Sequence, residues 1–254
     1  QDWASTYPLF HWGPIPWSFY MSLAVAFGFM IHVRKRNKQK YSEACRALLG
    51  SRVDGFWGKL IDLTAVFALL AGTATTFSLA TPLLSMAISH VAGIPESNVL
   101  TIAILVVICA VYTIAVYFGM EGVSKLAGSC VYLFFILLAY FLFLGGETRY
   151  IIETGFTAIG NMVQNFIGLA TFTDPLRTSN FPQNWTIFYW AWMLSFLPMM
   201  ALFVGRISRG QTIRKTVLGT GIWGGLGCML SFALFGGYAL YLQHSGTMDL
   251  AGIY

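Results

Sequence analysis

The sequence predicts an all-α protein, a polytopic membrane helix bundle, and three observations lead to that class. Of the 254 residues, 57% are hydrophobic and only 10% are charged, whereas a soluble domain carries about a quarter charged residues. The mean hydropathy of +0.68 indicates that lipid is the solvent for much of the chain. Apolar runs long enough to cross a bilayer recur along the sequence and alternate with short charged segments.

Six segments reach the roughly 20 apolar residues that a helix needs to span a bilayer. They are residues 14–33, 56–91, 98–118, 125–145, 184–205 and 216–242. The second and the sixth are longer than a minimal span, so we expect them to tilt or to extend beyond the lipid. Together the six segments predict a single transmembrane domain over residues 1–254.

The lysines and arginines give the orientation of these spans. The segments that follow the first, third and fifth spans hold 13 of the 15 Lys and Arg residues, and the opposite side holds only Arg149 and Arg177. Because loops rich in positive charge stay in the cytoplasm, both ends of the chain are predicted on the outer side. This distribution explains the formal net charge of +5 without nucleic acid as a partner.

Between the fourth and fifth spans, residues 150–170 are predicted to form an amphipathic helix on the outer side. Apolar residues recur there every three or four positions, at Ile152, Phe156, Ile159, Val163, Phe166 and Ala170. Such a helix can lie flat on the membrane surface or pack as a lid on the bundle, and the pattern leaves both open. The stretch TDPLRTSNFPQNW that follows is predicted to be a loop with a helix cap.

The charged and reactive residues argue against several classes of function. Every Asp and Glu falls in a loop or within about two turns of a span end, so no carboxylate relay for protons is predicted at mid-membrane. No HExxH, GxSxG or phosphate-binding motif occurs, which argues against an enzyme. The four cysteines are isolated in the sequence, so neither a metal site nor a disulfide framework is predicted.

The fifth span carries an unusual run of rings, FYWAWMLSFLPMM, at residues 188–200. Trp192 and Phe196 are four positions apart and therefore share one face of a helix. A stripe of this kind often serves packing alone. Pro198, however, should weaken the helix about one turn earlier, and transporters use broken helices at their binding sites. Pro82 suggests a second break, in the second span.

Rings without a carboxylate suit a weakly hydrated cation such as a quaternary ammonium. Cation–π attraction contributes roughly 0.5–2 kcal/mol per ring, so a few rings can hold a methylated nitrogen without a counter-ion. Thr75 and Thr76, in GTATTFSLA before Pro82, offer uncharged oxygens as well. Threonine hydroxyls inside helices commonly bond to the backbone of their own helix. Both interpretations of Thr75 and Thr76, as ligand-binding groups or as helix-bonded hydroxyls, therefore stay open.

Three stretches, LFHWGPIPW, FPQNWTIFYWAW and RISRGQTIR, resemble the betaine/choline/carnitine transporter family. SLATPLL and GIPESNVL strengthen the similarity to its carnitine/γ-butyrobetaine antiporter branch. The resemblance covers most of the chain and matches about the fourth to the ninth of twelve spans, so we expect a fragment. It implies an inverted-repeat (5+5) secondary-transporter fold, a lipid-embedded multi-pass protein of the bacterial inner (plasma) membrane, and a homotrimer that uses residues 150–170 for subunit contact.

The resemblance also implies a substrate site for a small quaternary ammonium compound. Trp12 and Trp192 match ring positions of the central substrate box, and Trp17 matches a tryptophan near an outer, secondary site. Met193 stands where family members usually have a second Trp. Phe196 stands where the antiporter has Tyr and the betaine importer has Trp, which makes the box thinner and less polar.

Other matches concern the coupling of transport. Met199 stands where the antiporter has Gln, and Met200 matches a methionine that replaces a sodium ion in the antiporter. Thr75 and Thr76 lie near hydroxyls that the sodium-coupled importer uses for Na⁺. Sodium, as a coupling ion, is the only cofactor that the resemblance suggests.

The sequence therefore predicts a secondary active transporter of carnitine, γ-butyrobetaine or betaine-type compounds by alternating access, working as an exchanger. A sodium-coupled importer of glycine betaine or choline is the alternative within the same class. A non-transport membrane enzyme or scaffold is the third possibility, and it lacks a catalytic constellation. The particular substrate, the stoichiometry and the coupling ion are not fixed by the residues.

Overall fold

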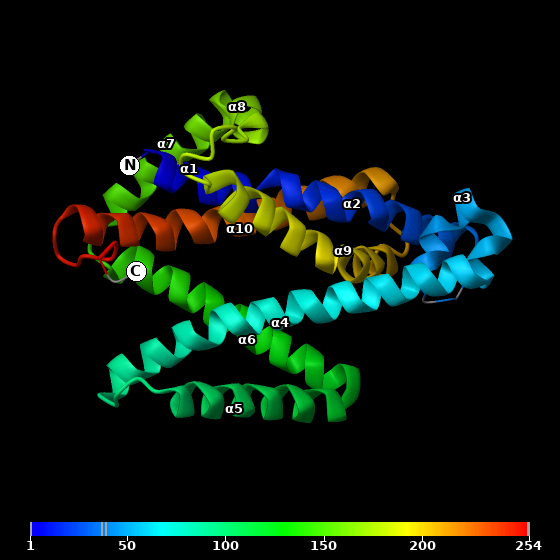
Figure 1. Cartoon of the computed structure of the whole chain (residues 1–254), viewed down its shortest axis with the longest axis horizontal. Coiled ribbons are helices and arrows are strands. Elements are labelled where there is room, and N and C mark those ends of the chain that lie inside the picture. The colour runs from blue at the N-terminus through cyan, green and yellow to red at the C-terminus, as the bar shows by residue number, and fades with distance from the viewer. Residues whose placement is uncertain (1, 37, 39, 253–254) are drawn as a thin grey trace. The chain divides into compact units, whose positions relative to one another are not determined.

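The computed structural model of the chain describes residues 2–36, 38 and 40–252 (Figure 1). Its helices are, in order, α1 (Asp2–Trp12), α2 (Pro14–Gly28), η1 (Phe29–Val33), η2 (Tyr41–Cys45), α3 (Arg46–Leu49), η3 (Gly50–Asp54), α4 (Phe56–Ala92), α5 (Asn98–Tyr117), α6 (Gly119–Leu144), α7 (Thr148–Gln164), α8 (Phe166–Thr171), η4 (Pro182–Ile187), α9 (Phe188–Ile207) and α10 (Ile213–His244). No strand occurs among the described residues. The predicted all-α class is confirmed.

Six helical segments of the described chain are long and apolar enough to cross a membrane, as predicted. They are Asp2–Val33, Phe56–Ala92, Asn98–Tyr117, Glu121–Leu144, Pro182–Ile207 and Ile213–His244. The first begins at Asp2 rather than at residue 14, because α1 is helical although it contains Pro8 and several polar residues. The hydroxyl groups of Ser5 and Thr6 donate to the Asp2 carbonyl oxygen and support the first turn of α1.

The first of these segments is interrupted between α1 and α2, at the sequence GPIP. Gly13 joins the two helices with a ψ of −135°, outside the helical region. A side chain at Gly13 would collide with the carbonyl oxygen of Leu9, so the connection requires glycine. Pro14 then begins α2, where a missing N–H is tolerated. The break thus follows directly after Trp12.

The breaks expected at Pro82 and Pro198 are absent, so that prediction is wrong. α4 continues through Pro82 and α9 continues through Pro198. A proline removes one N–H from the helix, and neighbouring side chains can compensate for it. In α9 the Ser195 hydroxyl donates to the carbonyl oxygen of Trp192, in the turn that Pro198 was expected to open. The irregular backbone lies instead before α9, in the π-helical η4.

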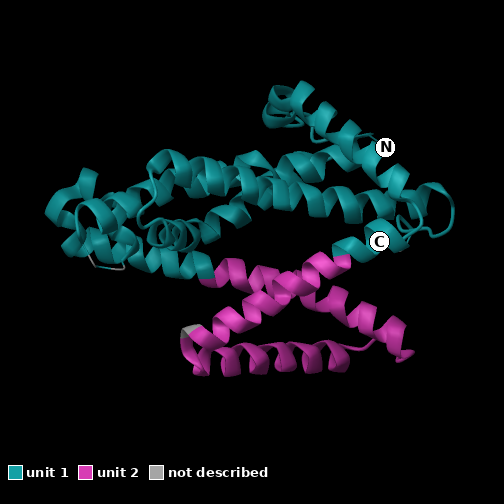
Figure 2. Cartoon of the chain, turned by 180° about the vertical axis from the view of Figure 1, so that it is seen from behind, with its two compact units in different colours: residues 1–69, 138–254 teal, residues 70–137 magenta. Residues whose placement is uncertain are grey.

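The chain divides into two compact units, residues 1–69 with 138–254 and residues 70–137 (Figure 2). The second unit holds most of α4, all of α5 and the first part of α6. Within it the Thr101 hydroxyl donates to the Ser85 hydroxyl oxygen at 3.0 Å and joins α5 to α4. A single transmembrane domain over residues 1–254 stays a prediction.

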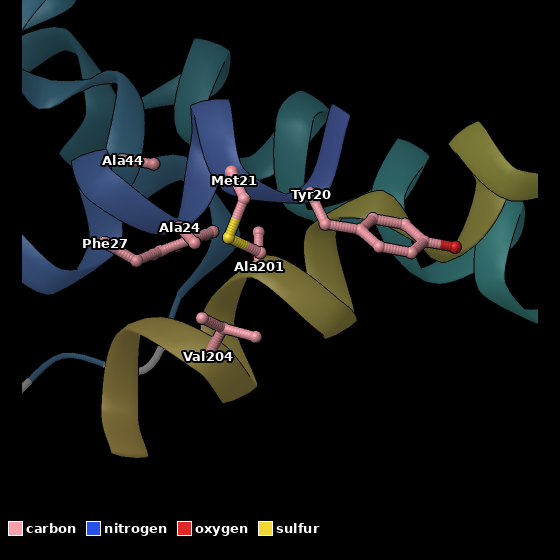
Figure 3. Packing of buried hydrophobic residues seen from close by; sticks show 7 residues of the cluster. All are labelled: Tyr20, Met21, Ala24, Phe27, Ala44, Ala201 and Val204. Atoms are coloured by element: carbon pink, nitrogen blue, oxygen red, sulfur yellow. The ribbon is translucent and has the colours of Figure 1, made fainter. Parts of the chain in front are cut away.

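In the first unit, α2 and α9 pack against each other and form the main core. Figure 3 shows Met21 and Ala24 of α2 facing Ala201 and Val204 of α9, and all four side chains are buried. The two helices approach most closely where small residues meet. A Cβ atom at Gly205 would lie 2.8 Å from the Phe27 Cβ and 2.9 Å from the backbone nitrogen of Gly28. The pair therefore depends on a backbone-to-backbone contact.

The predicted amphipathic segment is helical and forms α7 and α8, which are separated at Asn165. Its place on the outer side stays a prediction. The side of α7 formed by Ile151, Gly155, Ala158 and Met162 is buried, and the helix packs against α1 and α10. The apolar stripe predicted from the sequence lies on a different side and remains exposed, with Phe156 72% and Val163 68% exposed. Of the two arrangements that the sequence left open, α7 shows packing on the bundle. The residues that make this contact are not those of the predicted apolar stripe.

Candidate functional site

An aromatic cavity of about 650 Å³ lies in the first unit, where α1, the loop before η4, the start of α9 and α10 meet. It is lined by Trp3, Ala4, Tyr7, Pro8, His11, Trp12, Phe172, Ser179, Phe181, Trp185, Tyr189 and Phe232. None of these described lining residues is an acid, a lysine or an arginine. The cavity therefore offers ring faces and a few uncharged polar groups to a ligand.

Trp12, the last residue of α1, is the centre of a ring cluster. Its ring centroid lies 5.5 Å from that of Tyr189, 5.3 Å from that of Trp192 and 5.4 Å from that of Phe232. The first two pairs are edge-to-face, an arrangement that aromatic quadrupoles favour. Trp12 lines the cavity and also contacts Trp192, so it connects the cavity with the aromatic stripe of α9.

The aromatic stripe of α9 continues from Trp192 to Phe196, whose ring centroids are 5.4 Å apart. Both side chains are half-buried. The structure thus brings Trp12, Trp192 and Phe196 together, although they are far apart in the sequence. Trp192 and Phe196 are not among the described residues that line the cavity.

The three methionines of α9 have different surroundings. Met193 is buried, with 4% of its surface exposed. Met200 packs against the α2–α9 core, and Met199 is 37% exposed. None of them is among the described residues that line the aromatic cavity, so the structure does not join them to the rings around Trp12.

Trp17 lies away from the cavity, at the contact between α2 and α10. A Cβ atom at Gly224 of α10 would lie 2.5 Å from atoms of the Trp17 ring, so the indole packs directly on the glycine backbone. Its ring centroid is also 5.8 Å from that of Tyr20, a residue of the α2–α9 core. Trp17 is thus placed as a packing residue, and its role at an outer substrate site stays a prediction.

The hydroxyl groups considered for sodium bond to their own helix. Thr75 donates to the carbonyl oxygen of Ala71, and Thr76 donates to that of Gly72, within α4. This is the usual arrangement of threonine in a helix. Across the described residues, no group of three or more His, Cys, Asp or Glu side chains is placed to hold a metal ion. A sodium site at these threonines stays a prediction.

His11 fixes the wall of the cavity between α1 and η4. Its imidazole is 3% exposed, and its Nε2 atom lies 2.8 Å from the hydroxyl oxygen of Thr186. The ring is surrounded by other rings, with centroids at 5.5 Å for Tyr7 and 5.7 Å for Tyr189. This hydrogen bond and these ring contacts hold the end of α1, and with it Trp12, beside α9.

Several rings of the cavity were not predicted from the sequence. Tyr189 stands three positions before Trp192 on the same face of α9, so helical spacing could have identified it. Tyr7 was missed because residues 1–13 were not predicted to be helical. Phe181 opens the family-like stretch FPQNWTIFYWAW, which could have indicated it. Phe232 reaches the cavity from α10, and its sequence surroundings contain no comparable signal.

The arrangement is suited to a desolvated organic cation. Ring faces attract a positive charge, and the attraction increases where water is excluded. A ligand with a protonated amine would need hydrogen-bond acceptors in addition. The described lining provides few of these, so its chemistry favours a methylated nitrogen over a primary amine.

Comparisons with known proteins agree with this chemistry. A family model described as BCCT, betaine/carnitine/choline family transporter, matches residues 1–254. The chain is 31% identical over 248 residues to the uncharacterized transporter YeaV of Escherichia coli, covering 96% of this chain and 51% of that protein. It is 28% identical over 247 residues to a carnitine transporter of Acinetobacter baumannii, covering 97% and 45%.

A third relative is the glycine betaine transporter OpuD of Bacillus subtilis, which is 29% identical over 252 residues, covering 98% of this chain and 49% of that protein. The chain therefore spans about half the length of the curated relatives it matches. The family consists of transporters of the inner membrane and not of enzymes, in agreement with the six apolar helices. The chain belongs to the betaine/carnitine/choline transporter family.

Proposed function

We propose that the protein containing this chain is a secondary transporter of trimethylammonium compounds of the carnitine, γ-butyrobetaine or glycine betaine type. The observation that carries the proposal is the ring cluster around Trp12, at the edge of a cavity whose described lining contains no Asp, Glu, Lys or Arg. The names of two relatives, a carnitine transporter and a glycine betaine transporter, support the same class of substrate.

In this proposal Trp12 and Trp192 hold the methylated nitrogen, and Phe196 completes the wall. Their ring centroids are now at contact distance, 5.3 and 5.4 Å, so a ligand would part the rings or occupy the cavity side of Trp12. Tyr189 and Phe232 then become the neighbouring walls. The break after Trp12 allows α1 to change its angle to α2, as alternating access requires.

We propose exchange of one quaternary ammonium compound for another as the mode of coupling. Met199 and Met200 stay candidates for the coupling machinery, and Met193 for the wall of the box. The alternative is import of glycine betaine or choline coupled to Na⁺, through Thr75 and Thr76. An inverted repeat, a homotrimer with α7 and α8 at the subunit contact, and bound lipid belong to the same proposal.

Binding of radiolabelled carnitine, γ-butyrobetaine and glycine betaine to the purified full-length protein tests the proposal. Trp12→Ala and Trp192→Ala should each weaken binding by about 5- to 30-fold, because a cation–π contact of ~1–2 kcal/mol is lost with each ring. Trp223→Ala removes an indole that is 75% exposed on α10 and serves as the matched control. Absence of binding to the parent protein, or equal binding by all three variants, would contradict the proposal.

A further inference from the structure

The loop of residues 172–181, between α8 and η4, forms one end of the aromatic cavity. Phe172, Ser179 and Phe181 are among the lining residues, so both ends of the loop face the cavity. The ring centroid of Phe181 lies 4.5 Å from that of Tyr7 and 6.3 Å from that of His11, both on α1. The loop thus closes on the helix that carries Trp12.

The loop is organised around one buried carboxylate, Asp174, which is 3% exposed. One carboxylate oxygen accepts hydrogen bonds from the backbone nitrogen and the hydroxyl of Thr178, at 3.1 and 3.0 Å. The other accepts from the backbone nitrogen and the hydroxyl of Ser179, at 2.9 and 3.0 Å, and from the backbone nitrogen of Asn180, at 2.8 Å. Hydrogen bonds to a charged acceptor are stronger than neutral ones, so this set fixes the loop.

The backbone of the loop requires such support. Asp174, Arg177 and Asn180 have positive φ angles of 47°, 54° and 53°, a region that non-glycine residues seldom occupy. Such residues persist where surrounding contacts hold them. The backbone hydrogen bonds of Ser179 and Asn180 hold the pKa of the Asp174 carboxyl well below its usual range, although burial opposes this shift. The carboxylate is therefore charged at neutral pH.

A second contact ties the loop to the helix that follows it. The side-chain amide nitrogen of Gln183, in η4, donates to the carbonyl oxygen of Thr173 at 2.9 Å. The hydroxyl oxygen of Ser179 also accepts from the backbone nitrogen of Phe181 at 3.2 Å. Hydrogen bonds thus connect the Asp174 carboxylate to Ser179, and Ser179 to Phe181, whose ring lies in the cavity wall.

We propose that residues 172–181 are a preformed lid over the aromatic cavity and that Asp174 is the positioning residue that holds this lid in place. Asp174 does not line the cavity, so it acts on the ligand only through Ser179 and Phe181. The inference rests on the proposed function, because the ligand that passes the lid is a trimethylammonium compound. A tight lid slows both the entry and the exit of the ligand, and a loosened lid accelerates both.

Stopped-flow tryptophan fluorescence of the full-length protein, with carnitine and glycine betaine as ligands, tests this role. Asp174→Asn turns one acceptor oxygen into a donor that faces backbone N–H groups, so the lid should loosen. Both the association and the dissociation rate constants should rise by about fivefold or more, while the equilibrium dissociation constant stays within about threefold. Thr178→Ala removes only one of the five hydrogen bonds and should give a smaller change in the same direction.

Glu153→Gln is the matched control. It makes the same carboxylate-to-amide change on the neighbouring α7, where Glu153 is exposed and pairs with Arg149 at 2.8 Å. This variant should keep the parent rate constants. If Asp174→Asn and Thr178→Ala bind with parent rate constants, or if Asp174→Asn changes only one of the two rate constants or only the fraction of folded protein, the lid is excluded.

A measurement without ligand separates this inference from the proposed function. The substitution Phe232→Cys, in a background without the four native cysteines, reports access to the cavity from α10. Asp174→Asn should accelerate its labelling by a neutral maleimide by about fivefold or more, and Glu153→Gln should not. Ligand binding is measured on the parent protein, which keeps Phe232. Accelerated labelling together with a parent protein that binds neither ligand supports the lid and contradicts the proposed function, whereas unchanged labelling contradicts the lid alone.

Discussion

Replacing Gly205 by alanine should separate α2 from α9 and destabilise the first unit. An added Cβ atom would lie 2.8 Å from the Phe27 Cβ, 2.9 Å from the Gly28 nitrogen and 3.1 Å from the Ala24 carbonyl oxygen. Two of these three atoms belong to the backbone and cannot be moved by rotating a side chain. The helices must therefore shift apart, which loosens the packing of Met21 and Ala201 beside the contact.

The size of the effect follows from two costs. Overpacking of a core costs about 1–3 kcal/mol. The Gly205 carbonyl oxygen also lies 2.8 Å from Nε2 of His32, and the loss of one such hydrogen bond costs roughly 0.5–1.5 kcal/mol. Alanine is favoured over glycine inside a helix by about 0.5–1 kcal/mol, which offsets part of these costs. We expect the substitution to lower the free energy of unfolding by ~0.5–4 kcal/mol.

Thermal unfolding of the purified full-length protein, followed by tryptophan fluorescence, measures this change. Gly227→Ala in α10 is the control, because a Cβ atom there meets no atom within 4 Å. Removing a helical glycine without a clash should stabilise the helix by about 0.5–1 kcal/mol, so the two substitutions have opposite signs. If Gly205→Ala unfolds at the parent temperature or above it, the close approach of α2 and α9 is not as described.

Two further predictions concern charge and coupling. Glu43 is 2% exposed and pairs with Arg46 and Arg36, and the hydrogen bond from Arg46 keeps the pKa of Glu43 below its usual 4.5. The ion pairs of charged Glu43 stabilise the folded protein fully at neutral pH, and this stabilisation is lost as the pH falls below 4.5 and Glu43 takes up a proton. The unfolding temperature of the parent should therefore drop below pH 4.5, and that of Glu43→Gln should change less over the same range. Thr75→Val and Thr76→Val should leave the sodium response of substrate uptake unchanged, because both hydroxyls serve their own helix; loss of that response in both would support sodium coupling instead.

The six apolar helices could be predicted because lipid imposes one rule on every span. Backbone polar groups in the hydrocarbon core must be paired within the segment, so a long apolar run becomes a helix whatever it packs against. The pairing of Trp12 with Trp192 was expected from the family resemblance. Their separation of 180 positions makes the contact a tertiary one, which helical spacing alone does not give.

The remainder depended on contacts that the local sequence does not contain. Pro198 suggested a break in α9, but the helix continues, and the break lies at Gly13, where a side chain would meet a backbone oxygen. The apolar stripe of residues 150–170 suggested the buried side of that helix, but small residues such as Gly155 and Ala158 allow a closer approach to α1 and α10. Asp174 is an ordinary loop residue in the sequence, and only the folded loop shows its five donors.

The break at Gly13 also affects the electrostatic potential beside Trp12. Pro14 has no N–H with which to bond the carbonyl oxygen of Phe10, and α1 ends at Trp12, so carbonyl groups at its last turn lack helical partners. The aligned peptide dipoles of a helix place about half a negative elementary charge at such an end. A methylated cation beside the Trp12 indole would thus meet a negative potential supplied by the main chain, and this potential would persist when the ring itself is replaced.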